Sequence, residues 1–248
     1  MFDKKIEFIS HNDYVDLKED QPIPIKLNIP KWFKKLDHTI ENKTVKGCMP
    51  FLDSLTSGYL LKIPQDLKII HNTINPDTNQ PDSFYTTGDI DNQILYAKSI
   101  NLGKIKPDVH PPIQLKGSPY LEKNKNLPFL KILNPWIIKT PPGYSCLFTS
   151  PLNNTDDRFS IVPAIVDTDT FPNEINFPIV INGDKYPTLD TIIKKGTPYV
   201  QIIPFKRDKW KMKITGKNTE EIKKGKTFYG LSLLHIYKNK FWNKKSWN

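Results

Sequence analysis

The pattern of apolar and polar positions predicts short β-strands between prolines and glycines over the second half of the chain. In the run Glu174–Ile181 the apolar residues alternate with period two, which places every second side chain on one face. Short runs of this kind, often β-branched and bounded by turn residues, are typical of an antiparallel sandwich or barrel. The clearest predicted strands are Trp136–Thr140, Tyr144–Thr149, Ser160–Val166, Glu174–Ile181 and Tyr199–Phe205. The shared face of the fourth strand consists of Ile175, Phe177, Ile179 and Ile181.

The first 58 residues predict an extended arm followed by two short helices. Residues 1–30 end in a proline-spaced stretch, which fits an edge strand or an arm because proline is excluded from central strands. Pro30–Leu36 predicts a helix with proline in its first turn. Its buried side is expected to hold Trp32, Phe33 and Leu36. Cys48–Gly58 predicts a second helix, with Gly58 as its left-handed cap.

Tyr59–Ile63 and Leu67–His71 predict two further strands. The turn-rich stretch Asn72–Asp91 that follows them predicts a hairpin loop. The chain is therefore expected to have three parts: an arm with short helices over residues 1–58, a core domain over 59–205 and a tail over 206–248.

The C-terminal tail predicts helices. Asn218 or Thr219, followed by Glu220 and Glu221, is typical of a helix start, where carboxylates face the positive end of the helix dipole. Leu231–Phe241 predicts a second helix. Its apolar stripe would consist of Leu233, Ile236, Tyr237 and Phe241.

Composition excludes two broad classes of protein. The 22 prolines argue against a protein made of long helices, because an interior proline removes a hydrogen bond and clashes one turn back. The 38% hydrophobic and 11% aromatic residues are enough to bury a core, which argues against wholesale disorder.

The net charge of +10 belongs to the tail. Residues 204–248 hold 13 basic and 3 acidic residues, whereas residues 1–203 hold 23 of each. Three interpretations remain open: a solvated face, docking on an acidic protein with Trp242 and Trp247 as anchors, or nucleic-acid binding through lysines on phosphates and aromatics on bases. The candidate partner-binding residues are Lys238, Lys240, Trp242, Lys244, Lys245 and Trp247.

Cysteines and histidines give no sign of a metal site. Cys48 and Cys146 lie far apart, and the five histidines show no ligand spacing, so we expect no metal. Cys146 falls inside a predicted strand, which suggests a small buried residue rather than a nucleophile. The chain shows neither the apolar core of a signal peptide nor a membrane-spanning stretch, so we expect a protein of the cytoplasm or of a virion.

Asp167 and Asp169 are two residues apart after a predicted strand, so their side chains share a face if the strand continues. Such a pair could bind a metal or polarise water, with Glu174 close enough to join it. It could equally cap the end of a strand. The sequence leaves both interpretations open.

Three segments in order resemble the turns and strands of the dUTPase and dCTP deaminase superfamily. They are Lys139–Asn154, with its Pro-Pro-Gly turn, Ile165–Asp169 and Ile193–Pro204. The resemblance implies a β-clip fold and a trimer, with Asp167 activating water, Asp169 supporting it, and Ser150 and Gln201 contacting ligand. Other positions depart from the family pattern: Thr149 replaces its arginine, Pro151 its glycine and Thr197-Pro198 its Asp-Arg, and the glycine-rich phosphate arm has no counterpart.

A broader resemblance, covering most of the chain, is to an uncharacterised family of bacterial and tailed-phage proteins. The motifs that carry it are C-x-P-F-x-D-x-x-x-x-G-Y (Cys48–Tyr59), N-P-W-x-I-K-T-P-P-G-Y-S (Asn134–Ser145), V-D-T-D-T (Val166–Thr170), I-N-F-P (Ile175–Pro178) and K-G-T-P-x-x-Q-I-I-P-F-K-R (Lys195–Arg207). This likeness implies a bacteriophage source but no known reaction.

These observations predict a mainly β protein: a β-clip-like or jelly-roll antiparallel barrel or sandwich, with short helices, an extended N-terminal arm and a basic, partly helical tail. For function we expect a non-enzymatic binding, accessory or structural protein, including a virion component, that needs no cofactor. The alternative is a dUTPase-like hydrolase or binder of nucleotides that uses Asp167, with a divalent cation. Expected partners are proteins or further copies of the chain, with nucleic acid possible through the tail.

Overall fold

The computed structural model describes residues 4–39, 41–64, 66–72, 82–87, 108–224 and 237–248. The chain divides into two compact units. The first, here called the β unit, consists of Met1–Ile23 and Gly58–Lys206. The second unit consists of Pro24–Ser57 and Arg207–Asn248, so it joins a segment near the N-terminus to the C-terminal region.

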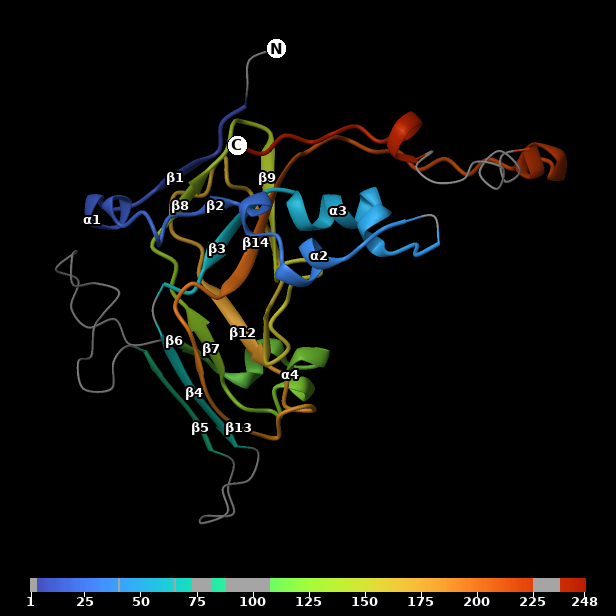
Figure 1. The fold of residues 1–248 in the computed structure, drawn as a ribbon. Coiled ribbons are helices and arrows are strands. Elements are labelled where there is room, and N and C mark those ends of the chain that lie inside the picture. The colour runs from blue at the N-terminus through green and yellow to red at the C-terminus, as the bar shows by residue number, and fades with distance from the viewer. Residues whose placement is uncertain (1–3, 40, 65, 73–81, 88–107, 225–236) are drawn as a thin grey trace. The chain divides into compact units, whose positions relative to one another are not determined.

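The β unit is built from antiparallel sheets (Figure 1). Its largest sheet has the strand order β11-β9-β14-β3-β2 and consists of Ala164–Val166, Tyr144–Thr149, Pro198–Lys206, Tyr59–Lys62 and Ile23–Pro24, in that order. A second sheet has the order β10-β12-β7-β6, formed by Phe159–Ile161, Phe177–Ile181, Phe129–Ile132 and Asp108–His110. A third has the order β13-β4-β5, formed by Thr188–Ile193, Leu67–Asn72 and Asp82–Thr87. The pair β1-β8 joins Glu7–Ile9 to Ile137–Lys139.

Short helices accompany these strands. In the β unit they are α1 (Asn12–Asp16), α4 (Pro119–Lys123) and the 3-10 turn η3 (Pro112–Leu115). The second unit contains α2 (Lys31–Lys35), α3 (Met49–Thr56), the 3-10 turns η1 (Ile25–Asn28) and η2 (Val45–Gly47), and the π-helical turn η4 (Tyr237–Phe241). The strand-rich architecture is confirmed, and among the described residues the strands do not close into a barrel.

One predicted strand is wrong in an informative way. Ser160–Val166 was expected to form a single strand, but it forms β10 and β11, which belong to different sheets. Pro163 lies between them. Because proline has no N–H to donate to a ladder, it ends one pairing, and the chain then switches to the other sheet.

The predicted hairpin loop Asn72–Asp91 is also only partly correct. Residues 82–87 form β5, which pairs antiparallel with β4 from Leu67↔Thr87 to Asn72↔Asp82. The remaining residues of the prediction, 73–81 and 88–91, lie outside the described residues.

The core of the β unit draws side chains from all of the larger sheets. Phe148 on β9, Ile179 on β12 and Ile69 on β4 are buried in one continuous cluster. The predicted face of Ile175, Phe177, Ile179 and Ile181 is confirmed as buried, although Ile175 lies just before β12. Val180 is buried as well, so both faces of β12 are covered.

The second unit confirms part of what the sequence predicted. Helix α2 forms within Pro30–Leu36, and Phe33 is buried and stacks on Phe51 of α3 at 5.9 Å between ring centroids. Trp32, expected on the same buried side, is exposed. The reason is geometric: adjacent positions of an α-helix differ by about 100° around its axis, so Trp32 and Phe33 point in different directions.

The start of the tail helix is confirmed in detail. Residues 219–224 are helical. The backbone N–H of Glu221 donates to Asn218 Oδ1 at 2.9 Å, and the N–H of Asn218 donates to Glu221 Oε2 at 3.3 Å. This reciprocal pair is a capping box, which satisfies two of the unpaired donors at a helix start. Of the second predicted helix, Leu231–Phe241, only the turn η4 lies within the described residues.

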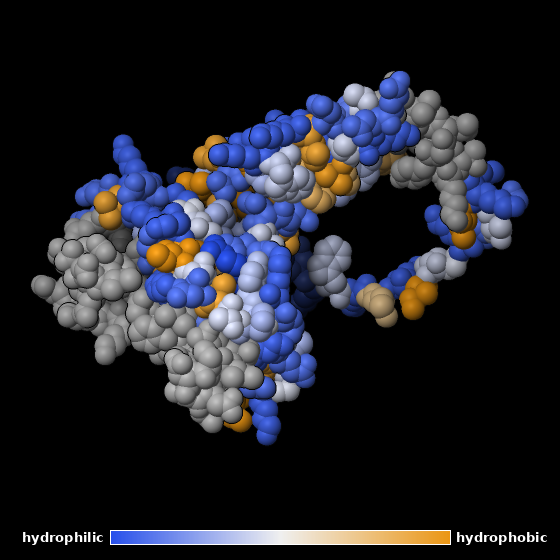
Figure 2. All heavy atoms as spheres, turned by 60° about the horizontal axis from the view of Figure 1, so that its bottom comes forward, coloured by the Kyte–Doolittle hydropathy of each residue, from blue (hydrophilic) through white to orange (hydrophobic). Residues whose placement is uncertain are grey.

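On the face that Figure 2 shows, hydrophilic residues predominate among the described residues, and hydrophobic residues form separate patches. Among the described helices, none combines the length and the apolar character that a membrane crossing requires.

Candidate functional site

Asp167 and Asp169 follow β11, where Asp167 contacts the start of β9 and Asp169 contacts the turn that precedes β9. Ser145 Oγ–H donates to Asp167 Oδ1 at 2.6 Å, and the backbone N–H of Gly143 donates to Asp169 Oδ2 at 2.8 Å. Hydrogen bonds to a carboxylate are stronger than those between neutral groups. The two carboxylates therefore fasten the Pro-Pro-Gly turn to the end of β11.

Thr168, between the two aspartates, completes this attachment from the buried side. Its side chain is fully buried, with its Oγ1 2.7 Å from Thr140 Oγ1 and 3.3 Å from Cys146 Sγ. The backbone N–H of Thr140 also donates to the carbonyl of Thr168 at 3.3 Å. Three successive residues of the V-D-T-D-T motif thus bind the same turn.

Ser150 and Gln201, the candidate ligand contacts, also hold strands and loops together. Ser150 Oγ accepts a hydrogen bond from the backbone N–H of Ile161 in β10, at 3.0 Å. Gln201 lies on β14, is fully buried, and its Oε1 accepts from the N–H of Leu152 at 2.8 Å. Each side chain accepts a hydrogen bond from a backbone N–H that is not paired within a sheet, and this role is structural.

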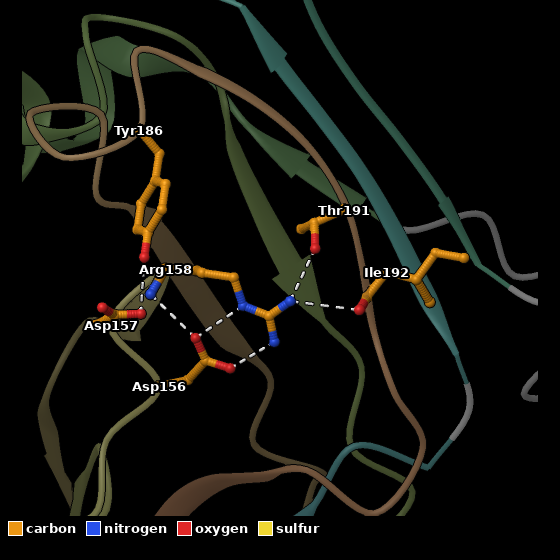
Figure 3. A network of polar contacts seen from close by, with 6 residues as sticks. All are labelled: Asp156, Asp157, Arg158, Tyr186, Thr191 and Ile192. Carbon is orange, nitrogen blue, oxygen red and sulfur yellow. Dashed lines mark hydrogen bonds and ion pairs between the residues drawn. The ribbon is translucent and has the colours of Figure 1, made fainter.

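Arg158 is the arginine of the β unit, and its guanidinium is engaged inside the fold (Figure 3). Its Nε donates to Asp156 Oδ1 at 2.9 Å and its Nη2 to Asp156 Oδ2 at 2.6 Å, a bidentate pair. Its Nη1 donates to Thr191 Oγ1 at 2.8 Å and to the carbonyl of Ile192 at 3.4 Å. Arg158 therefore connects the start of β10 to β13, and its guanidinium is bound by groups of the chain itself.

Asp157, beside Arg158, has its own partners (Figure 3). Lys185 Nζ forms an ion pair with it, and the Tyr186 hydroxyl donates to its Oδ1 at 3.0 Å. The hydrogen bond from Lys185, followed by the one from Tyr186, lowers the pKa of Asp157. The whole Asp156–Arg158 segment is thus fixed from the strands that follow it.

Neither cysteine shows catalytic features. Cys146 is buried, as its place in a strand predicted, and burial raises the pKa of its thiol to about 11. The nucleophilic thiolate is therefore scarce near neutral pH. Cys48 is exposed. Within the described part of the chain, no group of three or more His, Cys, Asp or Glu side chains is arranged to hold a metal ion.

Two of the candidate partner-binding residues in the tail contact α3 within the second unit. Trp242 Nε1–H donates to Asp53 Oδ1 and Oδ2 at 3.1 and 3.0 Å, and Lys245 Nζ donates to Asp53 Oδ2 at 2.6 Å. Trp247 is half-buried, while Lys238, Lys240 and Lys244 are exposed. The indole predicted as an anchor for a partner is therefore an anchor for the tail itself.

Sequence reasoning missed the groups that bind the candidate residues. Ser145 and Gly143 were recognised as parts of a motif, but not as the donors that face Asp167 and Asp169. Arg158 was also missed, although a signal existed, because it is one of only two arginines in a chain with 34 lysines. An arginine in a chain so rich in lysine indicates a position that uses the bidentate hydrogen bonding of a guanidinium, which lysine cannot provide.

We expect Asp167→Ala to lower the free energy of unfolding by about 1–3 kcal/mol, because it removes the acceptor of the buried Ser145 hydroxyl. Asp167→Asn should cost less, since it keeps an oxygen acceptor of the same shape. Urea unfolding of both variants measures the difference. In a double-mutant cycle with Ser145→Ala, the double variant should lose less free energy of unfolding than the sum of the two single losses. An Asp167→Ala variant as stable as wild type would show that the contact has no structural role.

A scan of the chain against models of known protein families finds no match, and a search of curated proteins finds no similar sequence.

Proposed function

We propose that this chain is a non-enzymatic binding or accessory protein whose basic C-terminal region attaches to an acidic protein partner. One observation carries the proposal: Asp167, Asp169, Ser150 and Gln201 each make a hydrogen bond that holds a turn or strand of the β unit. Residues that a dUTPase-like enzyme would direct at substrate are directed here at the protein's own backbone and at Ser145.

The chemistry of a nucleotide triphosphate supports the same conclusion. Its charge requires several fixed cations or backbone donors. The guanidinium of Arg158 is occupied by Asp156 and β13. Thr149 stands where the superfamily has its phosphate-binding arginine. The fold we propose is β-clip-like, but its ligand chemistry differs from that of the hydrolases.

The charge distribution supports an acidic partner. All of the net charge of +10 resides in residues 204–248. The candidate lysines of this region are exposed, and one of them, Lys245, is also paired with Asp53. The scarcity of arginine favours a protein over a nucleic acid, because recognition of base edges relies on arginine forks. The resemblance to tailed-phage proteins supports an accessory or virion role.

The test is a binding titration of the full chain against labelled poly-glutamate and against single-stranded DNA of the same length. We expect poly-glutamate to bind, with affinity falling as salt rises. The triple variant Lys238→Glu, Lys240→Glu, Lys244→Glu should bind markedly more weakly. A matched control changes three exposed lysines of the β unit by the same total charge: Lys5→Glu, Lys116→Glu, Lys139→Glu.

Equal losses in the two triple variants would show that only net charge matters, which contradicts a role for the tail. Tighter binding of DNA than of poly-glutamate would assign the tail to nucleic acid instead.

A further inference from the structure

Residues Lys209–Ile214 have the pattern of a β-strand that lacks a partner strand. Lysine and apolar residues alternate strictly, with lysines at 209, 211 and 213. The alternate apolar residues are Trp210, Met212 and Ile214, which are 89%, 89% and 87% exposed. In the part of the chain that the structure describes, this segment belongs to no helix or sheet.

Exposure of such a segment to water is unfavourable in free energy. Three large apolar side chains on one face of an extended chain are stabilised by burial against another surface. An extended backbone also carries a row of donors and acceptors that can extend an existing sheet. The alternation gives the segment one apolar and one basic face, so the surface it fits has a free strand edge, exposed apolar side chains and negative charge.

The β unit offers such a surface at β11. This strand is the outer member of its sheet, with β9 as its neighbour on one side. Ile165 at its centre is 63% exposed, and Phe171 nearby is 38% exposed. Residues 159–174, which include β11 and the segments on either side of it, contain no lysine or arginine but include three acidic residues. Those are Asp167, Asp169 and Glu174.

We propose that Lys209–Ile214 of one copy of this chain adds as a strand to the β11 edge of a second copy. The inference rests on the proposed function, since it names the partner of the basic region as another copy of the chain. Charge complementarity carries it: each copy holds both the basic strand and the lysine-free, acidic edge. Because the two surfaces differ, the contact produces a reciprocal dimer or a ring where its geometry closes, and an open filament where it does not.

The length of the connection argues against the same contact within one copy. Only Arg207 and Asp208 separate the segment from β14, and β9 lies between β14 and β11. Two residues suffice for a hairpin between adjacent strands. A strand added at the outer edge of β11 lies three strand spacings from β14, about 14 Å, which is farther than a two-residue link can reach.

The test combines sedimentation equilibrium with carbodiimide cross-linking of a mixture of ¹⁴N- and ¹⁵N-labelled full-length protein. We expect self-association with a Kd below about 100 μM, and we expect it to weaken as salt rises. We also expect cross-linked peptides that join residues 209–217 to residues 164–184 and that contain one light and one heavy partner. Ile165→Lys should weaken association roughly tenfold, because it places a cation where lysines arrive.

A matched control variant distinguishes this contact from nonspecific association. Ile113→Lys changes an equally exposed isoleucine, 66% accessible, away from β11, and should leave association unchanged. A monomer at all concentrations, cross-links confined to one copy, or equal effects of the two isoleucine variants would each overturn the proposal. None of these outcomes affects the poly-glutamate titration, so binding to a foreign acidic protein can survive when self-association fails.

Discussion

We expect Gly58→Ala to be the most damaging single substitution considered for this protein, lowering the free energy of unfolding by more than about 3 kcal/mol. Gly58 joins α3 to β3 with φ +82°, a conformation that costs a residue with a side chain. A Cβ at this position would also lie 2.0 Å from the carbonyl oxygen of Ile202. Ile202 pairs with Tyr59, so relief of the clash would separate β3 from β14.

Gly143→Ala is the matched control. Gly143 has φ +83°, but a Cβ there would meet nothing within 4 Å. The free energy of unfolding of this variant should therefore fall only by the conformational cost, about 1–2 kcal/mol. Chemical denaturation of both variants measures the difference. Equal losses would show that the contact with β14 does not matter.

The second large effect that we expect is a loss of stability in acid caused by His71. This residue lies on β4, is fully buried, and burial lowers its pKa from 6.5 to about 4. The unfolded chain therefore binds a proton more readily than the folded one between these pH values. Stability should fall as the pH drops from 6.5 towards 4, by about 3 kcal/mol in total, and the contribution should then level off.

The measurement is the free energy of unfolding of wild type and His71→Leu between pH 7 and about pH 4. The variant can differ from wild type by a constant offset, but its slope over this range should be shallower. Identical slopes for the two proteins would contradict the role of His71.

Sequence patterns correctly predicted the elements that are determined by residues close to them in the chain. The strand Tyr144–Thr149 formed with the bounds expected, and the helix after Asn218 formed with its capping box. Gly58 adopted the left-handed conformation that its place after α3 required. In each case the physical cause, a β-branched or aromatic run, a capping side chain or a missing Cβ, lies within a few residues of the element.

Other features depend on partners far away in sequence. Strand β13 was missed because Thr188–Ile193 has a weak pattern of its own, and it is held by pairing with β4 more than 100 residues earlier. The candidate site shows the same limit. The sequence placed Asp167 and Asp169 at a strand end, but it could not show that Ser145 and Gly143 face them. That arrangement depends on how β9 and β11 pair.

We propose that the acidic pair of the β unit, Asp167 and Asp169, is structural and that the protein does not act on nucleotides. The most direct test is thermal unfolding of wild type and Asp167→Asn with dUTP, dCTP and Mg²⁺, alone and combined. A nucleotide at a hundred times its Kd would stabilise the fold by about 2.7 kcal/mol, a rise in Tm of roughly 5–10 °C. We predict no shift in either protein. A shift of that size in wild type that Asp167→Asn abolishes would show that Asp167 serves nucleotide binding, because the asparagine keeps an acceptor for Ser145 and leaves the fold in place.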